Sequence, residues 1–182
     1  MWPFDIFKKK KVNVINNIPK RSKEEIELFD LAKDCVSRLS NEFKPLTPKG
    51  EAEALLFFSP IVVLLPELSS EMIMNDMEEK YMFLLCDAIK PIFDTDDFYD
   101  FANNRVEFYE EQYDKVKREK LYTPMFIYNA FYMNPGCDNP GYLKDFNEPP
   151  TVLLLLQSKL YELEMYIRKE RERIHYNYHF RY

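Results

Sequence analysis

The sequence is poor in glycine and histidine, and it has no apolar run long enough to cross a membrane. Its three glycines are Gly50, Gly136 and Gly141, which lie too far apart to form a glycine-rich phosphate-binding loop. The most apolar run, residues 54–65, is interrupted by Pro60. A membrane-spanning helix needs about 20 apolar residues. These shortages argue against a nucleotide-binding loop and a membrane span.

Cysteine and histidine are too sparse to indicate a metal centre. The three cysteines, Cys35, Cys86 and Cys137, lie in separate segments without C-x-x-C spacing, which argues against a disulfide scaffold and a zinc site. We expect buried, reduced thiols. His175 and His179 are four residues apart, a spacing that can bind a metal on a helix, but no H-E-x-x-H glutamate lies between them. The sequence therefore predicts no metal and no cofactor.

Familiar catalytic motifs are also lacking. The chain contains no G-x-S-x-G elbow, and it has one E-x-x-H, Glu172 to His175, where a di-metal bundle needs two. The acidic stretch from Asp94 superficially matches a calcium loop, but Phe98 falls at position 5 and Arg105 at position 12, where acidic ligands belong. We read these acids as complementing a helix dipole. The sequence predicts that the protein is not an enzyme.

The composition is that of one globular domain. Hydrophobic residues make up 46% of the 182 residues, charged residues 31% and aromatic residues 16%. The net charge of −6 disfavours nucleic acid as a partner, because phosphates repel an acidic surface. The chain starts with apolar residues followed by lysines, the reverse of the order in a secretory signal. We expect a cytoplasmic protein.

Helical periodicity dominates the chain and predicts an all-α fold, a single-domain bundle of about six helices. Residues 1–20 form an N-terminal arm and residues 21–182 the helical domain. An extended backbone is possible at both ends of the chain. In the arm apolar and polar residues alternate weakly, and in the C-terminal stretch 176–182 aromatic and polar residues alternate. The last helix carries an apolar stripe of Leu156, Leu160, Leu163 and Ile167, and the first one of Ile26, Phe29, Ala32, Val36, Leu39 and Phe43.

Prolines and capping residues mark the helix boundaries. A capping box of Ser22 and Glu25 predicts the first start, and Thr47-Pro48, Thr123-Pro124 and Pro149-Pro150 predict later ones. Pro45, Pro66 and Pro91 predict ends. Pro60 lies inside the most apolar helix and is expected to kink it or to split it in two, with Ser59 capping the second piece.

Arg105 is the one charged residue on the apolar face of the helix predicted within residues 94–120. That face carries Phe98, Phe101, Ala102, Val106, Tyr109, Tyr113 and Val116. A buried charge without a partner is costly, so Arg105 should form a buried ion pair, with Asp87, Asp76 or a helix-end carbonyl as its partner. The alternative is an anion-binding cleft formed by Arg105 and the long loop 134–148. We favour the ion pair.

Two terminal segments are candidates for binding. The arm combines the apolar anchors Trp2 and Phe4 with a basic run of Lys8, Lys9, Lys10 and Lys11, which is typical of membrane-surface segments. The C-terminal aromatics Tyr176, Tyr178, Phe180 and Tyr182 exceed what a small core needs, and tyrosine is favoured at protein interfaces.

These patterns rank three functions. The first is a non-enzymatic helical protein-interaction module of the adaptor, antitoxin or immunity type, from a bacterial or phage cytosol. Its partner would be another protein, with a basic surface that suits an acidic chain. The second is a peripheral membrane protein that uses the Trp2–Lys11 arm. The third is an enzyme or anion-binding protein with a cleft around Arg105.

Overall fold

The computed structural model describes residues 23–63, 71–93, 95, 98–119, 124–139, 143 and 146–179. At positions 71–79, 99, 103, 110, 112–119 and 179 it describes the backbone but not the side chain. The described part is an all-α bundle without strands, as the periodicity predicted. Its elements are α2 (Lys23–Glu42), α3 (Pro48–Val63), α4 (Glu71–Ile89), α5 (Phe98–Glu119), α6 (Pro124–Tyr128), the π-helix η2 (Asn129–Met133) and α7 (Pro150–His179).

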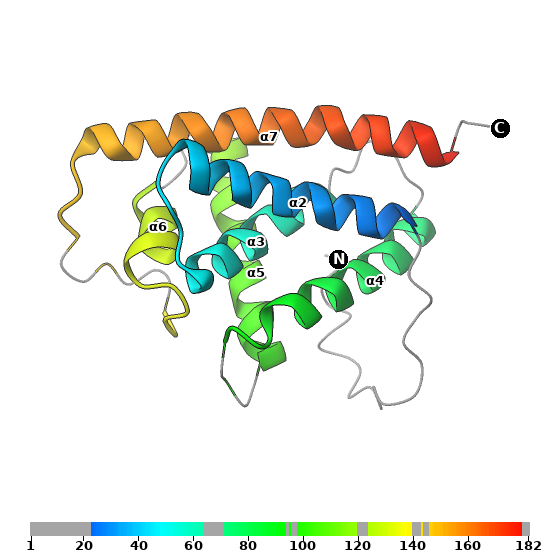
Figure 1. Ribbon diagram of the computed structural model, residues 1–182, viewed down its shortest axis with the longest axis horizontal. Helices are drawn as coiled ribbons and strands as arrows, with labels where there is room; N and C mark the ends of the chain where they lie inside the picture. Colours follow the sequence, from blue (N-terminus) through cyan, green and yellow to red (C-terminus); the bar gives the residue numbers. More distant parts are fainter. Residues whose placement is uncertain are drawn as a thin grey trace.

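Helix α3 is the central element of the bundle. It packs against α2, α4, α5, η2 and α7, and in Figure 1 it lies in the middle of the molecule behind α2. Every residue from Ala52 to Val63 is buried. This fits its sequence, which is apolar nearly all round, because such a helix can satisfy its side chains only when it is enclosed.

Helix α3 begins where the sequence predicts and continues through its proline. The Gly50 N–H donates to Thr47 Oγ1 (3.1 Å), so Thr47 caps the helix ahead of Pro48. Pro60 lies within one continuous helix, so the predicted split is wrong. Ser59 caps nothing: its hydroxyl donates to the Leu55 carbonyl (2.6 Å) and lies 3.0 Å from the Tyr81 hydroxyl of α4. Packing on all sides outweighs the cost of an internal proline.

Helix α7 is the longest element and runs along one edge of the bundle, with α2 beside it (Figure 1). Its inner face buries the predicted stripe of Leu156, Leu160, Leu163 and Ile167, together with Ile174. Each fully buried leucine contributes roughly 1.5–3 kcal/mol of transfer free energy. The buried Arg171 donates through Nη2 to the carbonyl of Val63 (2.9 Å), the last residue of α3. This contact satisfies a helix-end acceptor.

Two expectations about α2 and α7 are corrected. Ile26 is exposed, and the buried stripe of α2 comprises Leu28, Leu31, Ala32, Cys35, Val36 and Leu39. The strand-like alternation at the C-terminus is wrong for residues 176–179, because α7 continues to His179. Tyr178 is on the bundle side of this turn and its hydroxyl donates to Glu27 Oε1 of α2 (2.6 Å). Tertiary contacts therefore outweigh the local period.

Candidate functional site

Arg105 and Glu53 form a buried ion pair between α5 and α3. Arg105 is 2% exposed and Glu53 is fully buried. Arg105 Nε lies 3.0 Å from Glu53 Oε1, but the N–H bond is not aligned with this oxygen, so the contact is an ion pair rather than a hydrogen bond. The partner is thus Glu53 and not the exposed Asp87, and the side chain of Asp76 lies outside the described ones.

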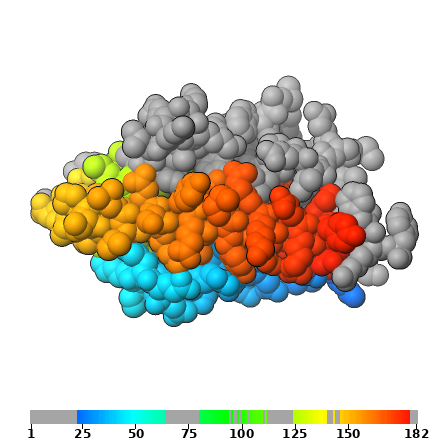
Figure 2. Space-filling model, turned by 90° about the horizontal axis from the view of Figure 1, so that it is seen from above, coloured from blue at the N-terminus to red at the C-terminus, as the bar shows by residue number. Residues whose placement is uncertain are grey.

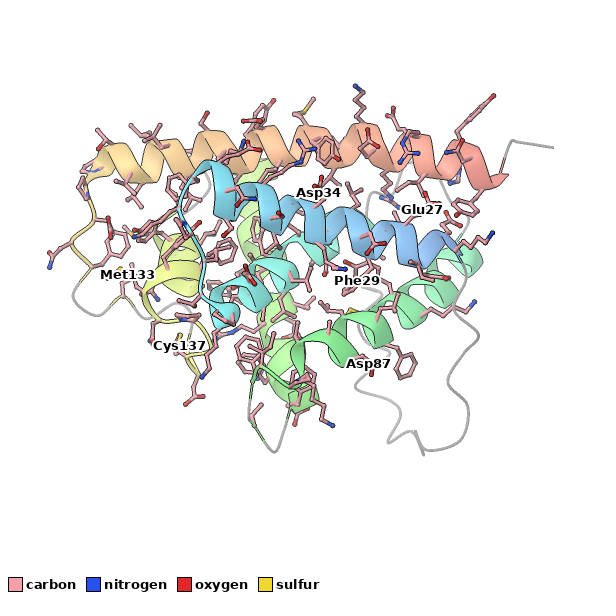
Figure 3. The ribbon with its side chains drawn as sticks, viewed as in Figure 1. Glu27, Phe29, Asp34, Asp87, Met133 and Cys137 are labelled. Atoms are coloured by element: carbon pink, nitrogen blue, oxygen red, sulfur yellow. The ribbon has the colours of Figure 1, made fainter. Side chains whose placement is uncertain are left out.

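Further donors surround the Glu53 carboxylate. The Tyr109 hydroxyl donates to Oε2 (2.6 Å), and the Gly136 N–H donates to Oε1 (2.9 Å). Arg105 Nη2 donates to the Cys137 carbonyl, and the guanidinium lies 4.9 Å from the centre of the Phe101 ring. Cys137 is labelled in Figure 3, on the turn below α6. The cluster therefore fastens the turn at residues 134–139 to α3 and α5.

The electrostatics of this cluster are those of a closed site. Burial raises the pKa of Glu53, while Arg105, Tyr109 and the Gly136 N–H each lower it again. Burial and the neighbouring Glu53 carboxylate raise the pKa of Tyr109 well above its ordinary value. Because both charges are enclosed and face each other, they hold the fold in place and offer no open charge to a ligand.

Glu53 is the member of this cluster that the sequence analysis missed. It lies in the segment A-E-A-L-L-F-F, and of the two acids in the most apolar helix, Glu51 and Glu53, it is the buried one. Arg105 is the matching exception on the apolar face of α5. An acid and a base that are both out of place on apolar faces are natural partners, because each would be costly to bury alone. That shared anomaly was the available signal.

Within the described residues, the cysteines and His175 do not form a common site. Burial raises the pKa of the Cys35 and Cys86 thiols to about 12, so both are protonated at neutral pH and are poor nucleophiles. Cys137 is half-buried, with its Sγ 3.8 Å from Arg105 Nη2. Among the described residues, no group of three or more His, Cys, Asp and Glu side chains is placed to hold a metal ion.

The predicted binding segments fall partly outside the described structure. Trp2, Phe4, Lys8, Lys9, Lys10 and Lys11 lie outside it, as do Phe180 and Tyr182. Of the C-terminal aromatics, Tyr176 is exposed and Tyr178 is held against α2. None of the described helices has the length and apolar character needed to cross a membrane.

The outer face of α7, defined here as Leu154, Leu155, Tyr161, Met165 and Tyr176, is an exposed apolar surface. These side chains are between 50% and 64% exposed. At 100° per residue, Leu154, Tyr161, Met165 and Tyr176 fall within about 60° of arc, on the side opposite the buried stripe. Figure 2 views the molecule from above and shows α7 crossing this side uncovered along its length. One helix thus has a second face with exposed apolar side chains, among which lie the exposed Ser158, Lys169 and Glu172, and this face does not pack on the bundle.

A groove of about 580 Å³ adjoins the outer face at the N-terminal half of α7. Leu155, Ser158 and Glu162 contribute to its wall, opposite Phe43 and Tyr128. Lys44 donates to the Tyr128 hydroxyl, which donates to Glu148 Oε1 (2.8 Å), and Lys159 is paired with both Glu42 and Glu162. The groove is therefore a prearranged polar hollow beside an apolar stripe, the combination found at many protein interfaces.

Comparisons with protein-family models, with curated proteins and with solved structures find no significant match to this chain. Two features of the molecule itself therefore bear on its function, the closed charge cluster and the outer face of α7.

Proposed function

We propose that this chain is a non-enzymatic helical protein-interaction module of the adaptor, antitoxin or immunity type, acting in a bacterial or phage cytoplasm, and that its binding surface is the outer face of α7. The observation that carries the proposal is the second apolar face of α7. Five large apolar side chains on one helix are at least half exposed, although the same helix already buries a full stripe against the bundle.

The cost of this surface in water supports a binding role. Single exposed apolar residues are ordinary, but Leu154, Leu155, Tyr161 and Met165 are exposed together within about three turns of one helix, and grouped apolar residues mark interaction sites. The composition also fits, because tyrosine and methionine are enriched at interfaces. The surface is rigid, since it belongs to a helix of 30 residues held by α2, α3 and α6. A rigid face loses little conformational entropy when it binds.

The interior supports the non-enzymatic part of the proposal. The Arg105 and Glu53 charges face each other and are closed to solvent, which is how a pair that stabilises a fold is arranged. A reactive centre would instead leave a titratable group within reach of a substrate. The Arg105 cluster thus favours a structural role, and the anion-binding alternative loses its motive.

The experiment is site-specific photo-crosslinking. A photoreactive amino acid is placed at Tyr161 on the outer face and, in a matched control, at Met133, an exposed apolar residue of η2 away from α7. The chain is irradiated in a cell extract at low and at high salt. We expect a discrete protein adduct from position 161 and none from position 133. Equal labelling at both positions, or no adduct from position 161, would overturn the proposal.

A further inference from the structure

We infer that the outer face of α7 binds the same face of a second copy of this chain, antiparallel, across a two-fold axis at Met165. This inference rests on the proposed function and names its partner. A two-fold axis makes one surface serve both partners, so the surface must complement itself. The stripe from Leu154 to Tyr176 is about 33 Å long at 1.5 Å per residue, which gives two paired copies a long line of contact.

The order of side chains along the stripe is complementary to its own reverse. With the axis at Met165, the two Met165 side chains meet at the centre. Leu154 faces Tyr176 of the second copy, so each end of the contact pairs an aliphatic side chain with an aromatic ring. Tyr161 faces Lys169 of the second copy, which places an ammonium group beside a tyrosine ring.

Charge along the rim favours the antiparallel arrangement. Glu162 is exposed on the N-terminal half of the outer face, whereas Lys169 and Arg173 are exposed on the C-terminal half of the same side. Antiparallel helices bring like rim positions of the two copies together, so Glu162 comes opposite Arg168 of the second copy and one residue from its Lys169. A parallel pair would bring opposite rims together and would leave Glu162 and Lys169 of the two copies about 10 Å apart along the helices, without this attraction.

The net charge of α7 also permits self-association. The whole chain carries −6, but α7 contains five basic and four acidic side chains. Two copies that approach through α7 therefore do not bring their acidic surfaces together. An approach through the remainder of the molecule would meet like-charge repulsion. Electrostatics thus directs a second copy to this face.

The groove beside α7 offers the second copy a further binding position on the same side of the helix. In this register Arg173 of the second copy comes opposite Gln157, next to Ser158 at the wall of the groove. Three of the charged residues that line the groove are acids, Glu42, Glu148 and Glu162, and two are lysines. An arginine from the second copy therefore enters a hollow of slightly negative character, and arginine is a favoured anchor at interfaces.

The first test measures the mass of the purified full-length chain by sedimentation equilibrium. We expect twice the 22.0 kDa of one chain. Met165→Glu brings two carboxylates together on the axis and should raise the dimer dissociation constant at least about a hundredfold. Met133→Glu makes the same change at an exposed methionine off α7 and should leave the dimer intact. Circular dichroism checks that each variant keeps its helices.

The second test reverses charges on the rim. Glu162→Lys and Lys169→Glu should each raise the dissociation constant about tenfold, and the chain carrying both should return to the wild-type value, because the pair is restored with its signs exchanged. A double variant that dimerises no more tightly than the single variants would overturn the antiparallel register.

A wild-type chain that stays monomeric up to about 1 mM would overturn self-association. If Tyr161 then still crosslinks to a protein of different mass, the interaction module stands with another partner; if it crosslinks to nothing, both proposals fail.

Discussion

The interior between α3 and α5 and the outer face of α7 reverse the usual distribution of side chains. The interior holds Glu53 and Arg105, both almost completely buried, whereas the outer face presents leucine, methionine and tyrosine to water. Both arrangements are unfavourable taken alone. They differ in what surrounds them, because the buried charges are fully enclosed by partners and the apolar stripe is not.

This difference separates stability from association. The charges inside are compensated by each other, by Tyr109 and by the turn at 134–139, so their effect is confined to the fold. The apolar side chains of the outer face pack on nothing within the chain, so they should contribute to association between molecules and not to the stability of the fold. Substitutions in the interior are therefore expected to change the free energy of unfolding, and substitutions on the outer face to change only association. Four measurements test this.

The largest effect is expected from Arg105→Met. Removing the cation leaves the Glu53 carboxylate buried without its counter-charge and should lower the free energy of unfolding by about 3–5 kcal/mol. Urea unfolding followed by circular dichroism measures it. The control is the double variant Glu53→Gln with Arg105→Met, which removes both charges, retains an acceptor for Tyr109 and should recover most of the loss. A stable single variant would show that the pair does not hold the fold.

The two faces of α7 allow a matched comparison within one helix. Leu163→Ala on the buried face should cost about 2–5 kcal/mol through lost burial and a cavity. Leu154→Ala on the outer face should change the free energy of unfolding of the isolated chain by less than about 0.5 kcal/mol. Both variants are compared by urea unfolding at a concentration where association is negligible. Similar losses at the two positions would mean that the outer face packs within the chain.

Tyr109→Phe probes the buried cluster with a smaller change. The variant keeps the ring but leaves Glu53 Oε2 without the hydroxyl that donates to it (2.6 Å). A hydrogen bond to a charged group contributes about 1.5–3 kcal/mol, and the free energy of unfolding should fall by that amount. Tyr161→Phe on the outer face is the control and should leave it unchanged. An unaffected Tyr109→Phe protein would contradict the role assigned to the hydroxyl.

The smallest effect lies where α7 is fastened to α2. The hydrogen bond to Glu27 raises the pKa of Tyr178 to about 12. Since the unfolded value is near 10, the contribution of this bond to stability is complete below pH 10 and is lost as the pH rises through about 12. NMR titration of the Tyr178 ring measures the pKa, and Glu27→Gln should lower it. A pKa that stays near 12 in that variant would assign the shift to another cause.

The sequence predicted the helices well because their signals are local. Thr47-Pro48 marked the start of α3, Pro91 follows the end of α4, and the spacing of Leu156, Leu160, Leu163 and Ile167 identified the buried face of α7. Each of these signals depends on residues within a few turns of one another. Arg105 was singled out in the same way, by its position on an apolar face.

What the sequence did not predict depends on contacts between distant segments. Glu53 is separated from Arg105 by 52 positions, and no local rule specifies which helix faces α5. Pro60 was expected to kink α3 or to split it in two, and the split does not occur, because a helix enclosed on all sides stays continuous through the proline. The outer face of α7 was computable from helical spacing, yet its exposure follows only from where the bundle lies.

Gly50 has a consequence for tracing the ancestry of this chain. A Cβ atom at this position would lie 2.3 Å from the carbonyl oxygen of Phe131, so only glycine lets the start of α3 approach η2 so closely. The same glycine donates to the capping hydroxyl of Thr47. The four letters Thr47 to Gly50 thus encode both a helix start and a contact between two backbones. In divergent descendants of this fold, T-P-x-G ahead of an apolar helix should outlast most of the surface sequence, and it can serve as a signature for finding them.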